Sequence, residues 1–166
     1  FLIKQVAPLQ YPSPLQLSTE VGDQIANYTP NEAKVMLEIN GHRQVFEQAG
    51  PRNQVAFQGD EVHAGIVTCG GLCPGLNNVI RGVVRCLWNR YDVRRITGFH
   101  YGYSGLSANP HKAPTPLTPK SVEQVHYQGG SFLGSSRGPQ SLDEMIETLK
   151  ELKITQLYCI GGDGTM

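Results

Sequence analysis

The chain has 166 residues, a formal net charge of zero and 17% charged residues. This length suffices for one domain with a buried core, and the balanced charge gives no indication of a nucleic-acid partner. No apolar run approaches the roughly 20 residues of a membrane-spanning helix, so no membrane partner is expected. The cysteines at positions 69, 73, 86 and 159 lack the neighbours of a metal site, which predicts reduced thiols in a cytoplasmic protein.

Residues 1–60 are predicted to form an N-terminal extension. Prolines at positions 8, 12, 14 and 30 disfavour a helix or a central strand, so residues 1–30 are expected to be an extended arm. Residues 34–39 and 43–46 flank Asn40 and Gly41, a pair typical of a two-residue β-hairpin turn. Residues 55–57 are a candidate short edge strand.

Residues 64–77 are predicted to form a buried strand, a glycine-rich turn and the start of a helix. Ile66 and Val67 suit a parallel strand that is covered on both faces. Gly70 and Gly71 permit a sharp turn and the close approach of a ligand, and the helix N-terminus after Pro74 favours an anion. The segment therefore indicates a phosphate site, although a tight turn without a ligand explains the same residues.

A helix is predicted over about 75–90, with one buried face made by Leu76, Val79, Ile80, Val83, Val84, Leu87 and Trp88. Asn77, Arg81 and Arg85 lie on another face at intervals of four. Arginines at this spacing repel each other slightly, and a shared anionic partner would relieve the repulsion. A solvated face is the alternative interpretation.

The next elements are a strand over 94–99, an aromatic loop over 100–106 and an irregular connection over 107–117. Tyr103 in this loop is suitably placed to stack on a base at the carboxyl end of a strand, or to pack in the core. Thr118 and Pro119 predict the start of a short helix that runs to about Tyr127.

Residues 130–139 form a loop of small and hydroxyl side chains around Arg137, a composition that suits a phosphate or a flexible turn. Ser141 and Glu144 then form a capping box for a helix. Its buried stripe is predicted to be Leu142, Met145, Ile146 and Leu149. A strand over 154–160 leads to the glycine-rich turn 161–165.

This alternation predicts an α/β fold, a three-layer sandwich with a largely parallel sheet, in a nucleotide-binding domain at 61–166. Ligands bind such sheets beyond the carboxyl ends of the strands, where the loops 69–77, 100–105 and 161–165 lie. The loop 134–138 can join them. Asp163 is the acidic residue of these loops and the candidate for holding Mg²⁺, the alternative being an ordinary turn aspartate. The sequence stops just after this turn, so a fragment with an incomplete domain is expected.

Three segments resemble the phosphofructokinase family: residues 70–77, 134–137 and 161–165, within a similarity that covers about 60–166. The amino-acid sequences of residues 67–71, 134–139 and 49–52 resemble those of the family branch with a long N-terminus, which is found in plants, trypanosomatids and some bacteria. The resemblance implies a role for each matching residue. Gly71, Tyr103, Arg137, Gly138, Gly162, Asp163, Gly164 and Thr165 would bind the nucleotide, with Tyr103 near the adenine and Mg²⁺ on Asp163.

The same resemblance makes Arg137 catalytic, because it would stabilise the charge of the transferring phosphoryl group. Arg81 and Arg85 match arginines that bind an allosteric nucleotide in the bacterial branch. The glycine at position 164 makes the chain similar to the ATP-dependent members of the family, since the pyrophosphate-dependent members tend to have an aspartate at this position. The general base of the family, an aspartate downstream of residues 161–165, is not in the sequence, so the chain alone is predicted to be inactive.

The implied reaction transfers the γ-phosphoryl group of Mg·ATP to the 1-hydroxyl of fructose 6-phosphate, a step of glycolysis. A homo-oligomer, dimer or tetramer, is expected, and a cytoplasmic location, with a glycosome-like or plastid compartment as alternatives. The alternative functions are a pyrophosphate-dependent phosphotransferase and a non-catalytic nucleotide-binding regulatory homologue. A nicotinamide-dependent dehydrogenase fits poorly because the first loop lacks the G-x-G-x-x-G pattern.

Overall fold

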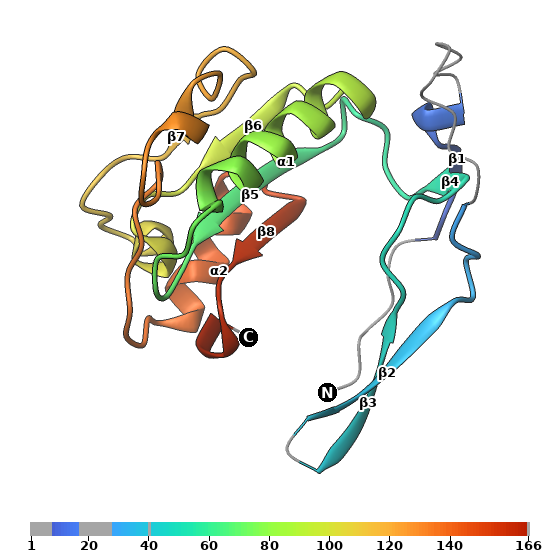
Figure 1. Ribbon diagram of the computed structural model, residues 1–166, viewed down its shortest axis with the longest axis horizontal. Coiled ribbons are helices and arrows are strands. Elements are labelled where there is room, and N and C mark those ends of the chain that lie inside the picture. The colour runs from blue at the N-terminus through green and yellow to red at the C-terminus, as the bar shows by residue number, and fades with distance from the viewer. Residues whose placement is uncertain (1–7, 17–27, 40, 166) are drawn as a thin grey trace. The chain divides into compact units, whose positions relative to one another are not determined.

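The computed structural model describes residues 8–16, 28–39 and 41–165, and the chain divides into two compact units, Phe1–Gln58 and Gly59–Met166 (Figure 1). None of the helices in these described ranges has the length and apolar composition needed to cross a membrane.

The N-terminal unit contains two small antiparallel sheets. β1 (Tyr11–Pro12) pairs with β4 (Gln54–Val55), and a 3₁₀ turn, Pro14–Gln16, follows β1. β4 lies one residue earlier than the strand expected at 55–57. β2 (Lys34–Ile39) and β3 (His42–Glu47) form the hairpin expected from Asn40 and Gly41, and β3 is longer than expected by a residue at each end. Gly41 has a φ of 75°, as the turn requires.

Arg52 holds together the segments on either side of the hairpin. Its guanidinium donates hydrogen bonds to the carbonyl oxygens of Pro30 (2.6 Å) and Gln48 (2.8 Å). Gly50 lies against Thr29 with no room for a side chain. The turn at 49–52, one of the segments on which the family resemblance rests, therefore connects the segment before the hairpin to the segment after it. Most of the arm expected at 1–30 lies outside the described residues.

The second unit is built on a sheet with the strand order β7-β6-β5-β8. β5 (His63–Thr68) runs parallel to β6 (Arg95–Gly98) on one side and to β8 (Gln156–Ile160) on the other. The largely parallel sheet is thus confirmed. β7 (Thr115–Pro116) pairs antiparallel with β6 in a segment that was expected to be irregular. Pro116 is tolerated there because an edge strand has an unpaired side.

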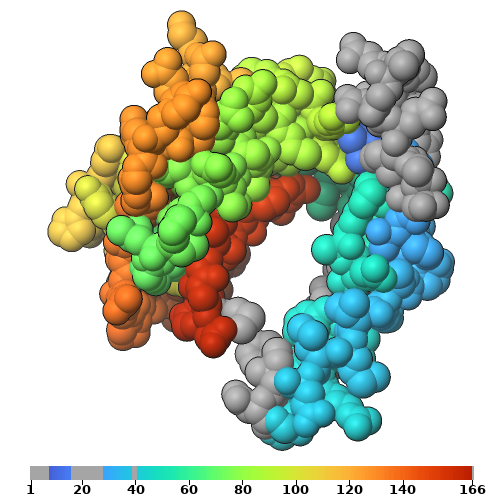
Figure 2. Space-filling model, viewed as in Figure 1, coloured from blue at the N-terminus to red at the C-terminus, as the bar shows by residue number. Residues whose placement is uncertain are grey.

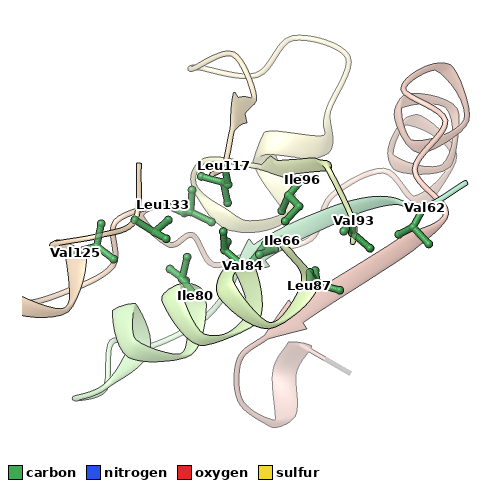
Figure 3. Packing of buried hydrophobic residues seen from close by; sticks show 12 residues of the cluster. Val62, Ile66, Ile80, Val84, Leu87, Val93, Ile96, Leu117, Val125 and Leu133 are labelled. Atoms are coloured by element: carbon green, nitrogen blue, oxygen red, sulfur yellow. The ribbon is translucent and has the colours of Figure 1, made fainter. Parts of the chain in front are cut away.

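Two helices cover opposite faces of this sheet and make the three predicted layers. On one face Ile80, Val84 and Leu87 of α1 (Leu76–Arg90) point toward Ile66 and Ile96 (Figure 3). On the other face Met145 and Leu149 of α2 (Leu142–Glu151) pack against a cluster that contains Val67, Phe99 and Leu106. Successive residues of β5 serve the two faces in turn, as the period of a strand requires.

The buried faces predicted for the helices are partly wrong. Val79 of α1 is 47% exposed, because the contact with the sheet is centred on the row Leu76, Ile80, Val84 and Leu87. Leu142 and Ile146 of α2 are 65% and 38% exposed. Only the Met145–Leu149 side of α2 reaches the cluster beneath it, and no other described segment covers the remaining apolar side chains.

The prediction of a short helix from Thr118 to Tyr127 is wrong. Turns occupy this segment and end in a 3₁₀ turn, Val125–Tyr127. Thr118 and Ser121 each accept a hydrogen bond from the other's backbone N–H, at 3.1 and 2.9 Å, and the N–H of Val122 donates to the carbonyl oxygen of Thr118 (3.2 Å), so a single turn forms at the expected start and no helix continues from it. Val122 and Val125 are buried in the core and fix the path of this segment.

Candidate functional site

A cavity of about 350 Å³ opens at the carboxyl ends of β5 and β8. It is lined by Cys69, Gly70, Gly71, Tyr103, Ser136, Arg137, Gly138, Gly162, Gly164 and Thr165. In Figure 2 the green atoms of the first glycine-rich loop lie beside the red atoms of β8 and the turn after it. Every residue predicted to bind the nucleotide lines this cavity except Asp163. Asp163 begins the turn Asp163–Thr165 between two lining residues, and it is exposed.

Backbone hydrogen bonds join the first loop to the others. The N–H of Cys69 donates to the carbonyl oxygen of Ile160 (2.8 Å), which continues the pairing of β5 with β8. Gly70 has a φ of 78°, and its N–H donates to Ser136 (3.1 Å), while the hydroxyl of Ser135 donates to Gly70 (2.5 Å). The two loops predicted to bind phosphate are therefore fixed against each other.

Arg137 extends over Gly71. A β-carbon on Gly71 would lie 3.3 Å from Nη2 of Arg137, which is tight contact for a carbon atom. The absence of that carbon lets the guanidinium and a ligand share the space above the loop. The arrangement joins a bare backbone to a planar cation, the combination that binds phosphate oxygens in a fixed geometry.

Tyr103 connects the loop after β6 to the turn after β8. It lies in the 3₁₀ turn Gly102–Leu106, and its hydroxyl donates to the carbonyl oxygen of Thr165 (2.7 Å). The N–H of Thr165 in turn donates to Gly162 (2.9 Å). Burial, and then the neighbouring thiol of Cys159, raise the pKa of Tyr103, so the phenol stays protonated and able to donate.

The first turn of α1 does not line this cavity in the part of the chain that the structure describes. Gly75, Asn77 and Asn78 line a separate hollow with His126 and Gln128. The helix start was expected to point its free N–H groups at the bound anion. Instead residues 69–71 provide the backbone that faces the cavity, and residues 72–75, which are not among its lining residues, lead to the start of α1.

Thr68 and Asn77 hold the Arg137 loop, and the sequence did not single out either residue for this role. The buried hydroxyl of Thr68 donates to the carbonyl oxygen of Gly134 (2.5 Å) and lies 2.9 Å from the hydroxyl of Ser131. Asn77, which is 3% exposed, donates to Gln128 (3.0 Å) and accepts from the N–H of Phe132 (2.6 Å). Asn77 and Arg81 both donate to the segment 123–128, which agrees with their predicted common face, but the alternative of a solvated face is wrong for Asn77 because its side chain is buried.

Asp163 fits a shared role in holding a cation. Its carboxylate makes no hydrogen bond or ion pair with another described residue, and no group of three metal-ligating side chains occurs in the described ranges. A hard cation such as Mg²⁺ prefers oxygen ligands, several of which are often phosphate oxygens and water. Asp163 would therefore hold Mg²⁺ together with the phosphates of a ligand.

Arg81 and Arg85 lie on α1, away from the cavity lining. Nε of Arg81 donates to the carbonyl oxygen of Glu123 (3.2 Å), and Arg85 is exposed. Their assignment to an effector stays a prediction.

The cysteines described by the structure are free thiols, and Cys69 is buried, which raises its pKa.

The second unit of the chain matches a known protein family. A family model for phosphofructokinase matches residues 63–166, more than half of the chain. The chain belongs to the phosphofructokinase family. The resemblance of the glycine-rich loops to this family is thus confirmed.

Relatives of this phosphofructokinase chain come from plants, bacteria and trypanosomatids. It is 49% identical over 133 residues to ATP-dependent 6-phosphofructokinase 7 of Arabidopsis thaliana, covering 80% of this chain and 27% of that one. The ATP-dependent enzyme of Amycolatopsis methanolica is 54% identical over 121 residues (73% and 26%). That of Trypanosoma cruzi is 48% identical over 119 residues (72% and 24%). The chain spans about a quarter of the length of these relatives.

Solved structures support the fold. Phosphofructokinase of Pichia pastoris in the T-state matches with a TM-score of 0.57 and 21% identity, over 80% of this chain and 17% of that one. A pyrophosphate-dependent phosphofructokinase from Marinobacter aquaeolei matches with a TM-score of 0.55 and 17% identity, over 63% and 27%. The α/β architecture of the second unit is therefore that of the family.

Proposed function

We propose that this chain is the ATP-site part of an ATP-dependent 6-phosphofructokinase. The enzyme would transfer the γ-phosphoryl group of ATP to the 1-hydroxyl of fructose 6-phosphate. The observation that carries the proposal is the meeting of four loops in one cavity, with Arg137 above the bare backbone of Gly71. Such an arrangement supplies the positioning and charge neutralisation that phosphoryl transfer needs.

Each part of the cavity has a role in this proposal. The glycines of the loops admit the phosphate chain close to the backbone, and Arg137 stabilises the charge on the transferring group. The aromatic ring of Tyr103 lies at the cavity wall, where it contacts the adenine. Asp163 would hold Mg²⁺, which neutralises phosphate charge when it is bound.

Gly164 supports ATP over pyrophosphate as the phosphoryl donor. A β-carbon on Gly164 would meet no atom within 4 Å, so an aspartate there would fit without disturbing the fold. Its carboxylate would lie at the cavity wall and repel the α-phosphate of ATP. A glycine leaves that space open. The relatives named above are ATP-dependent enzymes, which favours the same donor.

Titration calorimetry of the chain with Mg·ATP and with Mg·pyrophosphate tests the proposal. Mg·ATP is expected to bind, and Gly164→Asp is expected to weaken its binding at least about tenfold through like-charge repulsion. Gly164→Ala, which adds the carbon without the charge, is the matched control and should retain most of the affinity. Equal loss in both variants, or binding of pyrophosphate alone, would contradict the proposed donor.

Turnover separates the enzyme from a non-catalytic nucleotide-binding homologue. The chain alone is expected to bind nucleotide without phosphorylating fructose 6-phosphate, because the family's general base is not among its residues. The whole protein is expected to turn over fructose 6-phosphate with ATP. A whole protein that binds Mg·ATP yet shows no turnover would instead favour the regulatory homologue.

A further inference from the structure

The hairpin of the N-terminal unit is too small to be stable by its own contacts. β2 and β3 form a two-stranded sheet in the described part of the chain, and isolated hairpins of this kind are marginal in water. Val35, Met36, Leu37 and Val45 are 39%, 64%, 49% and 50% exposed. Apolar side chains on both faces and an unpaired strand edge indicate a surface that another segment covers.

The hydrogen-bonding pattern shows which residues face the open edge of β2. The N–H of Gln48 donates to the carbonyl oxygen of Ala33 (2.9 Å), so Ala33, just before β2, directs its carbonyl toward the β3 side of the hairpin. Residues of an antiparallel pair alternate in this respect. Val35 and Leu37 therefore bond to β3 as well, and Lys34, Met36 and Glu38 direct their N–H and C=O groups outward.

The charges on this edge are symmetric about Met36. Lys34 lies two residues before it and Glu38 lies two residues after it. In an antiparallel pair of β2 strands with a twofold axis at Met36, Lys34 of each copy faces Glu38 of the other. Val35 faces Leu37, and Met36 faces Met36. Lys34, Met36 and Glu38 are the residues with outward backbone groups, so all of them would exchange hydrogen bonds in this register.

The same register extends the side-chain pattern of the hairpin. Within one hairpin Lys34 lies opposite Glu47, Met36 opposite Val45, and Glu38 opposite Arg43. Joining two copies in this register gives an apolar row across the four strands, made by Val45, Met36, Met36 and Val45. On each side of it lies a charged row in which the sign alternates: Glu47, Lys34, Glu38 and Arg43. Opposite charges and apolar pairs across strands both stabilise a sheet. The other face brings Val35 of each copy against Leu37 of the other.

We propose that two copies of this chain associate through the outer edges of their β2 strands, antiparallel about Met36, into a four-stranded sheet. The interface is isologous, because the same edge serves both copies. The outer edge of β3 has a similar charge order, from Arg43 to Glu47, but its pairing would place Phe46 against Gln44. The more apolar β2 edge, with Val35 against Leu37, is therefore the one that associates.

Analytical ultracentrifugation of the chain tests the proposal with matched proline variants. The wild-type chain is expected to dimerise at micromolar concentration. Met36→Pro removes an outward N–H and no bond of the hairpin, and should weaken the dimer at least about a hundredfold. Val45→Pro makes the same change on the outer edge of β3 and should leave the dimer intact. A monomeric wild type, or a dimer that only Val45→Pro disrupts, would overturn the proposal.

Charge reversal tests the register. Lys34→Glu and Glu38→Lys each place like charges opposite one another in a homodimer, and each alone should weaken it about tenfold. In a mixture of the two variants every charged pair across the interface is again opposite in sign, so a heterodimer should form more tightly than either homodimer, while the like-charged pairs created within each hairpin, opposite Glu47 and Arg43, are the same in both assemblies. Circular dichroism checks that both variants are folded. A mixture that associates no better than its separate components would overturn the Met36 register.

Discussion

The hydroxyl of Tyr103 donates a 2.7 Å hydrogen bond to the carbonyl oxygen of Thr165. This bond joins the loop after β6 to the turn that carries Asp163, although the two residues lie far apart in the sequence. The ring of the same side chain lines the cavity. Tyr103 therefore has a second role beside the expected contact with the base, because it fixes the position of the turn 161–165.

Tyr103→Phe should loosen this turn while it keeps the aromatic ring. The loss of one net hydrogen bond, about 1 kcal/mol, predicts roughly fivefold weaker binding of Mg·ATP in titration calorimetry. Tyr101→Phe is the matched control, since it removes a hydroxyl from an exposed tyrosine of the same loop. An equal effect of the two substitutions would show that the bond to Thr165 does not fix the site.

The parts of the fold set by local signals were predicted well. Ile66 and Val67 marked a strand buried on both faces, and Ser141 caps α2 by accepting from the N–H of Glu144 (3.4 Å). The other half of that capping box was wrong. The carboxylate of Glu144 accepts from the N–H of Ala108 (3.4 Å) instead of reaching back to Ser141. A tertiary contact displaced the local one, and no pattern within the helix shows such a competitor.

The site was predictable from its glycines and less so from its polar side chains. Glycine-rich turns after strands identify a cavity because the geometry is local. Thr68 and Asn77 look like an ordinary strand end and a helix surface position. Their roles depend on Gly134, Phe132 and Gln128, whose positions follow only from the fold. Buried polar side chains of this kind are visible only once their partners are placed.

Asn77→Ala should destabilise the second unit. It removes a buried side chain that holds the N–H of the half-buried Phe132 and the carbonyl oxygen of Gln128. The expected loss in the free energy of unfolding is about 2–3 kcal/mol, measured by urea denaturation. Asn78→Ala is the control, because Asn78 is the next residue of α1 and is exposed. Similar losses for both variants would contradict the proposed clamp.

Two glycine-to-alanine substitutions should change stability in opposite directions. Gly82 is exposed within α1, and a β-carbon there would meet no atom within 4 Å, so Gly82→Ala should raise the free energy of unfolding by about 0.8 kcal/mol. A β-carbon on Gly65 would lie 2.9 Å from Phe99 and 3.0 Å from Leu157. Gly65→Ala should lower it by about 1–3 kcal/mol through overpacking. Thermal melts of both variants check the signs, and a stabilised Gly65→Ala would contradict the tight contact of β5 with that face.

His100 should make the fold sensitive to acid. It is 4% exposed, and its Nε2 lies 2.8 Å from the hydroxyl of Thr115. Burial, with a smaller contribution from Lys112, lowers the pKa of His100 below its usual 6.5. Below pH 6.5 the unfolded chain therefore binds a proton that the folded chain does not, and the free energy of unfolding falls with pH until the pKa of the folded state is passed.

Urea denaturation between pH 8 and pH 5, with an NMR titration of the imidazole, measures this effect. The wild-type chain is expected to lose stability as the pH falls through about 6.5, and His100→Gln is expected to show a smaller loss over the same interval. Some loss should persist in the variant, because burial also lowers the pKa of His63, beside Thr97. An imidazole of His100 that titrates at or above pH 6.5, or a variant with an unchanged slope, would contradict the assignment. Since His100 begins the loop that carries Tyr103, acid protonation should also weaken Mg·ATP binding in the same pH interval.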